Sequence, residues 1–132
     1  MMLKSSFVSR FDCSASVSEG WAEFTVHVDK NHYHGAGGVH GSLYFFALDN
    51  AAMLAANSII TDSVVFTTDF TVRFLRPMRN GIIRAVGNLV ELSQSKIHVE
   101  AKAYDDTNRE LAHASGTFLP ARLPLNEDIG YS

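Results

Sequence analysis

Apolar and polar residues alternate along several stretches of the chain, most clearly from Trp21 to Asp29. A period of two is typical of a strand with one buried face. The apolar face carries Ala22, Phe24, Val26 and Val28, and the polar face carries Glu23, Thr25, His27 and Asp29. The segment is therefore predicted to be a half-buried strand.

The longest apolar stretch follows a glycine-rich loop and lacks this alternation. From about Gly41 to Ser58 the chain is rich in Ala, Leu and Met, which favour helices. An apolar run of about 20 residues could also span a bilayer. The region 39–60 nevertheless contains His40, Ser42, Asp49, Asn50, Asn57 and Ser58. These polar residues favour a buried helix over a transmembrane one.

Four more strand patterns follow the helix, at 64–75, 82–92, 97–104 and 111–119. The first places Phe66, Thr68, Phe70, Val72 and Phe74 on one side, and Thr67, Asp69, Thr71 and Arg73 on the other. Pro77 ends this strand because proline cannot donate to a ladder. Asn80-Gly81 indicates a turn, and Gly87 indicates a bulge in the second strand.

Short polar turns join these strands, so an antiparallel meander is predicted. The apolar helix needs cover, and a curved sheet provides it. The expected fold class is α+β, with one long central helix wrapped by a curved antiparallel sheet. We expect a single domain over 1–132, with peripheral extensions at 1–12 and 121–132.

Charge and cysteine content exclude several classes of protein. The 11 basic and 14 acidic residues give a net charge of −3, which provides no global attraction to nucleic acid or an acidic membrane. Cys13 is the only cysteine, which excludes an internal disulfide and suits a reducing compartment. Because 1–10 also lacks the apolar core of a signal peptide, we expect a cytoplasmic protein.

Candidate chemistry concentrates in the loop before the helix and in the helix itself. Three histidines and four glycines crowd the segment 32–41. Glycines let backbone N–H groups approach a ligand, and a helix N-terminus adds unpaired N–H groups and a positive dipole end. Asp49 is a lone carboxylate in an apolar helix, which is costly unless it is paired or used. An active site for a substrate that develops negative charge on oxygen is therefore predicted.

Two motifs carry a family resemblance. His40, Gly41, Leu48, Asp49, Asn50, Ala51 and Ala52 form the string H-G-x-x-x-x-x-x-L-D-N-A-A, and F-L-R-P occupies 74–77. With the expected architecture, they resemble hotdog-fold acyl-CoA thioesterases of the phenylacetic-acid-degradation (PaaI-like) branch, over about 17–119. The resemblance implies hydrolysis of a thioester to coenzyme A, with no further cofactor and no metal. It also implies a homodimer with its helices side by side, or a dimer of such dimers.

The resemblance also implies roles for individual residues. Asp49 would activate or orient the attacking water or attack directly, the Gly41 amide would donate to the thioester oxygen, and Thr67 would assist the carboxylate. The chain departs from the family pattern at Ser42, where many relatives have a second glycine, and at His34, where they often have Asn. His34 could exchange a proton as well as orient a group. His34 and His40 complete the expected catalytic set, and His40 is interpreted as a residue that fixes the loop in preference to an acid or base.

Substrate contacts are expected from three regions. The acyl chain would lie along Phe45, Met53 and Leu54, and the coenzyme phosphates would meet Arg73, Arg76 or Arg79. The turn at 93–96 would bracket the pantetheine arm. The complete set of expected binding residues is Ser42, Phe45, Met53, Thr68, Arg76, Ser93, Gln94 and Ser95.

Helix geometry places a constraint on this site. His40 and Asp49 are nine residues apart, about 13.5 Å along a helix and on opposite sides of it. One chain cannot easily bring both to one carbon. A two-fold dimer with antiparallel helices would set the glycine end of one helix beside Asp49 of the other.

Other interpretations remain open at the sequence level. Asp49 could instead cap a loop or pair with an arginine, and Thr67 could belong to a polar cross-strand ladder. His32, His34 and His40 could bind a metal ion. The alternative functions are a hotdog acyl-CoA hydratase or dehydratase and a non-catalytic acyl-CoA-binding domain.

Overall fold

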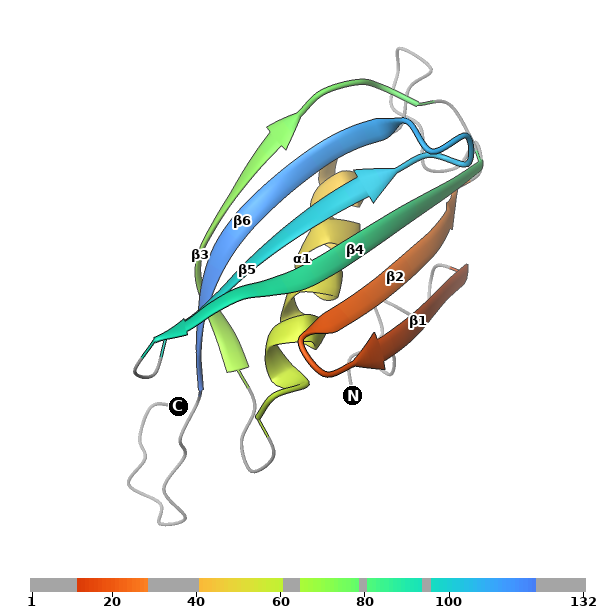
Figure 1. Cartoon of the computed structure of the whole chain (residues 1–132). Coiled ribbons are helices and arrows are strands. Elements are labelled where there is room, and N and C mark those ends of the chain that lie inside the picture. The colour runs from red at the N-terminus through yellow and green to blue at the C-terminus, as the bar shows by residue number, and fades with distance from the viewer. Residues whose placement is uncertain (1–11, 29–40, 61–64, 79–80, 94–95, 121–132) are drawn as a thin grey trace, which may run out of the picture.

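The computed structural model describes residues 12–28, 41–60, 65–78, 81–93 and 96–120. In these residues one helix, α1 (Gly41–Asn57), packs on one face of a curved six-stranded sheet (Figure 1). The strands are β1 (Asp12–Ser18), β2 (Trp21–Val28), β3 (Val65–Phe74), β4 (Gly81–Ser93), β5 (Lys96–Tyr104) and β6 (Glu110–Pro120). Each strand pairs antiparallel with its neighbours. The expected architecture of a helix wrapped by an antiparallel sheet is confirmed.

The strand order corrects the predicted meander. The sheet runs β1-β2-β4-β5-β6-β3, so among the strands that follow α1 only β4, β5 and β6 are consecutive in both chain and space. β3 pairs with β6 at the far edge, and the chain crosses the ends of two strands before β4 begins. The meander was wrong for β3 because a polar turn signal shows where a strand ends but not which strand it pairs with. β1, which pairs with β2 at the other edge, was not predicted.

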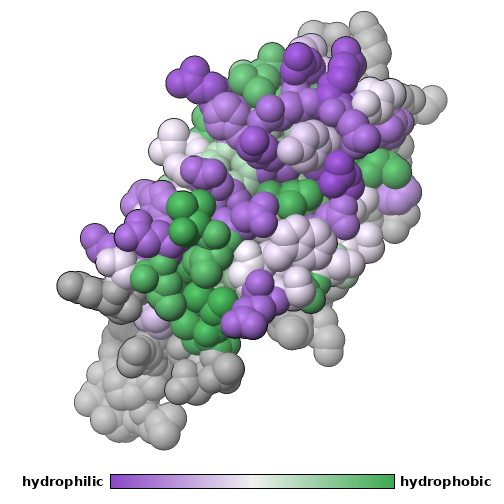
Figure 2. Space-filling view, viewed as in Figure 1, coloured by the Kyte–Doolittle hydropathy of each residue, from purple (hydrophilic) through white to green (hydrophobic). Residues whose placement is uncertain are grey.

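The core lies between α1 and the concave face of the sheet. The alternation predicted for β2 is confirmed, since Ala22, Phe24, Val26 and Val28 are all buried. On the face of the sheet turned away from α1, Figure 2 shows hydrophilic side chains over the upper part and a hydrophobic patch at the lower left. No helix in the described ranges is long and apolar enough to cross a membrane.

Gly87 allows α1 to lie close to β4. A Cβ at this position would stand 2.6 Å from the backbone oxygen of Ala51. The glycine is therefore needed for close helix packing and not for the predicted bulge. The irregularity in β4 lies between Leu89 and Glu91 instead.

Candidate active site

Asp49 lies on the side of α1 that the sheet leaves partly exposed. The Thr67 hydroxyl on β3 donates a hydrogen bond of 3.4 Å to Asp49 Oδ1. Burial raises the pKa of Asp49, and the hydrogen bond from Thr67 lowers it by a smaller amount. Within the described ranges Asp49 makes no ion pair, so the alternative of a structural arginine partner finds no support there. A carboxylate with a raised pKa is a stronger base toward water.

A β-bulge brings Thr67 to Asp49. Thr67 stands opposite the buried Phe118, and the register then shifts by one residue. The core-facing side chains that follow are therefore Phe70 and Val72, and not Asp69 and Thr71 as strict alternation from Thr67 would give. The predicted strand face was therefore wrong at its start. Phe66 is 48% exposed and does not share a face with Phe70. Thr67 faces α1 and does not belong to the polar cross-strand ladder that was the alternative.

Thr68 is the extra residue of this bulge. It is exposed, and its hydroxyl donates to the backbone oxygen of Thr117 at 3.0 Å. Thr68 therefore stabilises the irregular edge of the sheet. Its expected contact with substrate stays a prediction.

The first residue of α1 opens onto a groove of about 330 Å³. Its lining consists of Gly41, Tyr44, Phe74, Leu75, Arg76 and Pro77. The groove thus unites the start of the helix with the F-L-R-P segment, two parts of the motif that are distant in sequence. The ring of Phe74 closes one side, because a Cβ at Gly41 would lie 3.5 Å from it.

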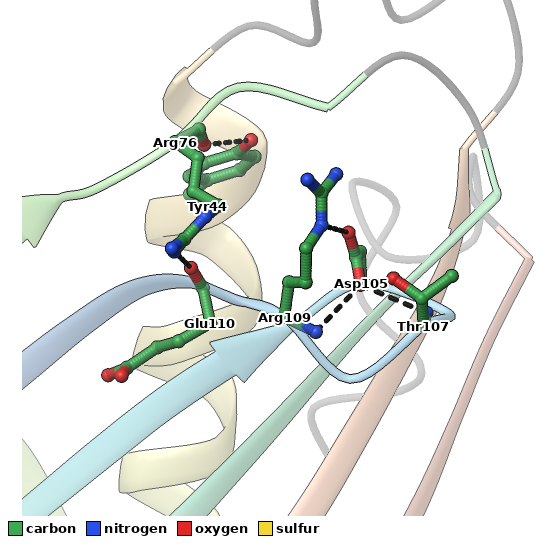
Figure 3. A network of polar contacts seen from close by, with 6 residues as sticks. All are labelled: Tyr44, Arg76, Asp105, Thr107, Arg109 and Glu110. Carbon is green, nitrogen blue, oxygen red and sulfur yellow. Dashed lines mark hydrogen bonds and ion pairs between the residues drawn. The ribbon is translucent and has the colours of Figure 1, made fainter.

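Hydrogen bonds hold Arg76 at the rim of this groove (Figure 3). The Tyr44 hydroxyl donates to the backbone oxygen of Arg76 at 2.9 Å, and Arg76 Nη1 donates to the backbone oxygen of Glu110 at 2.7 Å. Burial raises the pKa of Tyr44 to about 12, so this hydroxyl stays protonated and remains a donor at neutral pH. Arg76 is otherwise exposed, which leaves guanidinium N–H groups available for an anion.

The turn before Glu110 is organised by the buried Asp105 (Figure 3). Its Oδ1 accepts from the Thr107 N–H, the Thr107 hydroxyl and the Arg109 N–H at 2.8–2.9 Å, and Oδ2 accepts from Arg109 Nε at 3.1 Å. Burial alone would raise the pKa of Asp105, but the hydrogen bonds from Arg109 and Thr107 outweigh it and hold the pKa at about 2. The sequence predicted a turn here, but neither this carboxylate hub nor the role of Tyr44.

Gly41 and Asp49 cannot reach one carbonyl group within a single chain. They are eight residues apart in one continuous helix, which separates them by about 12 Å along the axis. A group that reacts must lie within about 3 Å of both the base and the oxyanion donor. A second chain is therefore required if both residues act on the same carbonyl.

Phe45 and Met53 extend the same helix ridge. Residues at a spacing of four form one row on a helix surface, so Gly41, Phe45, Asp49 and Met53 belong to a single ridge. Phe45 is 43% exposed, and its ring meets the ring of Phe70 edge-on at 5.4 Å between centroids. Met53 is partly buried. These residues place apolar surface on both sides of Asp49 along the helix.

Several predicted residues lie elsewhere or outside the described ranges. Arg73 lines a separate groove on the outer face of the sheet with Lys102 and His113, and it does not line the groove at Gly41. Ser93 is exposed at the end of β4. The residues His32, His34, His40, Arg79, Gln94 and Ser95 lie outside the described ranges. The ranges that are described hold no cluster of three potential metal ligands.

The fold is that of the hotdog class, and the pair of Asp49 and Thr67 forms the candidate site on its central helix. Residues 36–112 match the Thioesterase superfamily. The chain belongs to this superfamily. It is also 32% identical over 96 residues to VNG_1336C, a provisionally named esterase of Halobacterium salinarum. That match covers 67% of this chain and 64% of the relative, so the chain spans less than two thirds of the curated relative that it matches.

Solved structures share the fold at low sequence identity. Thioesterase HI1161 of Haemophilus influenzae is 21% identical with a TM-score of 0.82, covering 90% of this chain and 85% of its own. The Escherichia coli PaaI protein of the phenylacetic acid degradation operon is 20% identical with a TM-score of 0.82, covering 90% and 86%. BH2602 of Bacillus halodurans, solved with CoA, is 24% identical with a TM-score of 0.71, covering 74% and 66%. The resemblance to hotdog thioesterases that the motifs indicated is confirmed.

Proposed function

We propose that this protein hydrolyses acyl-CoA thioesters to a free acid and coenzyme A. The observation that carries the proposal is Asp49, a partly buried carboxylate that accepts a hydrogen bond from Thr67 within an otherwise apolar helix. Membership of the Thioesterase superfamily supports thioester chemistry, and the CoA in the BH2602 structure supports the leaving group.

Asp49 serves as the general base in the proposed reaction. Its carboxylate takes a proton from a water molecule while the water oxygen bonds to the thioester carbon. Thr67 holds Oδ1, so Oδ2 is the oxygen that receives the proton. The tetrahedral intermediate then expels the coenzyme A thiolate as the C–S bond breaks, and the proton from Asp49 passes to the sulfur. The raised pKa of Asp49 favours the first of these transfers, in which the carboxylate takes the proton from water.

The Gly41 amide of one protomer stabilises the oxyanion that forms beside Asp49 of the other protomer. Helix N-terminal N–H groups lack partners in their own helix and point toward incoming negative charge. Because about 12 Å separates Gly41 from Asp49, we place two α1 helices antiparallel in a homodimer. Each of the two equivalent sites then takes Gly41 from one protomer and Asp49 from the other.

The groove at Gly41 accommodates the coenzyme arm. Phe74 and Tyr44 supply apolar walls for pantetheine, and Arg76 at the rim supplies a positive charge for phosphate. Ser42 is exposed on the first turn beside this groove. The acyl group lies on the helix ridge near Phe45.

A thiol-release assay tests the proposal. The purified protein is given a panel of acyl-CoA substrates with a thiol reagent, and only hydrolysis releases free coenzyme A. Asp49→Asn should abolish thiol release while the fold is retained, and the exposed control Asp69→Asn should leave it unchanged. Thiol release by Asp49→Asn at the wild-type rate would contradict the assignment. Hydration without thiol release, or binding without turnover, would identify one of the two alternative functions.

A mixed-dimer experiment tests the shared site. Gly41→Pro removes the donor N–H at the first helical position, where proline is tolerated. When this variant and Asp49→Ala are unfolded and refolded together, about half of the dimers are mixed, and each mixed dimer has one intact site. Roughly a quarter of the wild-type activity should return from two inactive proteins. Mixed dimers that stay inactive would show that the site does not combine these groups across two chains.

A further inference from the structure

The position of Phe45 carries an inference that rests on the proposed function. In a two-fold dimer, Gly41 beside the partner's Asp49 requires Asp49 to lie beside the partner's Gly41. The symmetry axis must then cross α1 midway between these two residues. The residue at this midpoint is Phe45, which belongs to the same helix ridge.

We infer that the two-fold axis passes at Phe45, and that the paired Phe45 rings form the wall between the two acyl pockets of the dimer. Phe45 is suited to such a position because it is 43% exposed on the side of α1 left open by the sheet. A second copy of the chain covers that apolar surface, which a lone protomer leaves to solvent.

The ring of Phe45 is supported from behind by a row of aromatic side chains. Phe70 meets Phe45 edge-on at 5.4 Å, and Phe70 meets the buried Phe118 at 6.4 Å. Gly116 on β6 makes room for this row, because a Cβ there would collide with the Phe70 ring. Aromatic rings at these distances and angles attract one another, so the wall is held in place by the protomer that provides it.

The direction of the substrate places its acyl group against this wall. The thiol and acyl parts of the substrate extend from the reacting carbonyl carbon in opposite directions. The coenzyme side occupies the Gly41 groove with Arg76, which lies away from the axis. The acyl side therefore extends toward the axis, where Phe45 stands about 6 Å along the helix from Asp49. Phe45 thus sets the maximum acyl length.

Disulfide trapping tests the location of the axis. The chain's only cysteine, Cys13, is first replaced by serine. In packed helices about 8–10 Å apart, facing Cα atoms at the axis are close enough for a disulfide. Phe45→Cys should therefore form a covalent dimer on oxidation. Met53→Cys is the matched control, because two such residues would lie about 24 Å apart along the antiparallel helices and should not crosslink.

Acyl-length selectivity tests the wall. Phe45→Ala should raise the kcat/KM for chains longer than the wild-type optimum, by about fourfold for each methylene newly accommodated. Phe45→Leu provides a milder opening if the alanine variant dimerises poorly. An unchanged length optimum in dimeric Phe45→Ala or Phe45→Leu would refute the inference that Phe45 limits the length of the acyl chain.

The outcomes separate this inference from the proposed function. A dimer that releases thiol but crosslinks through Met53→Cys and not through Phe45→Cys would overturn the axis position and leave the thioesterase activity standing. Crosslinking through Phe45→Cys in a protein that releases no thiol from any acyl-CoA would support the axis and refute the function. A monomer in solution would refute the wall and the shared site together.

Discussion

Asp105 provides a stability test that follows directly from the structure. The carboxylate is 6% exposed and accepts four hydrogen bonds from Thr107 and Arg109. Its pKa falls from 3.8 to about 2. Since each pKa unit corresponds to about 1.4 kcal/mol, the charged form contributes roughly 2 kcal/mol to folding at pH 7. Asp105→Asn resembles the protonated acid in shape and should lose about this amount.

The pH dependence has a definite sign. A lowered pKa in the folded state gives stability that is fully present above the unfolded pKa of 3.8 and is lost as the pH falls through about 2. The difference in free energy of unfolding between wild type and Asp105→Asn should therefore decline from roughly 2 kcal/mol at pH 7 to about half of that at pH 3, and should be small at pH 2. Urea unfolding followed by circular dichroism at one protein concentration measures this difference.

Asp106→Asn is the matched control for this experiment. It removes the same charge from the same turn, but at an exposed residue that takes no part in the four hydrogen bonds. Its effect should stay within about 0.5 kcal/mol. The reasoning is refuted if Asp105→Asn costs no more than Asp106→Asn at pH 7, or if its cost is the same at pH 3 as at pH 7.

Three further predictions concern the site and its support. Thr67→Val removes the hydrogen bond that lowers the pKa of Asp49, so the acid limb of the kcat/KM profile should move to higher pH, whereas Thr67→Ser should keep it in place. Gly87→Ala should cost about 1–3 kcal/mol in urea unfolding, because its Cβ would press on the backbone oxygen of Ala51; unchanged stability would contradict the packing. Arg76→Ala should weaken the salt dependence of the KM for acyl-CoA. Equal salt dependence in wild type for acyl-CoA and a short uncharged thioester would exclude Arg76 from phosphate binding.

The local pattern of the chain was enough to locate most of its elements. Alternating residues predicted β2, and the Ala-rich run predicted α1 to within one residue of its observed end at Asn57. Asp49 could be singled out as the lone charge of that helix. These features depend on neighbouring residues alone, because the period of apolar positions and the cost of burying one charge need no knowledge of distant contacts.

Contacts between segments that are distant in the sequence decided how these elements pair and pack. The bulge after Thr67 turned this residue from the outer face toward Asp49, and the pairing of β3 with β6 placed β3 at the sheet edge. Gly87 proved to serve the close packing of α1 and not a bulge. Strand partners, register shifts and close approaches are set by how all faces fill one core, and no local pattern contains that information. The sequence by itself therefore singled out the candidate residues for the chemistry, and the tertiary structure decided which of them meet.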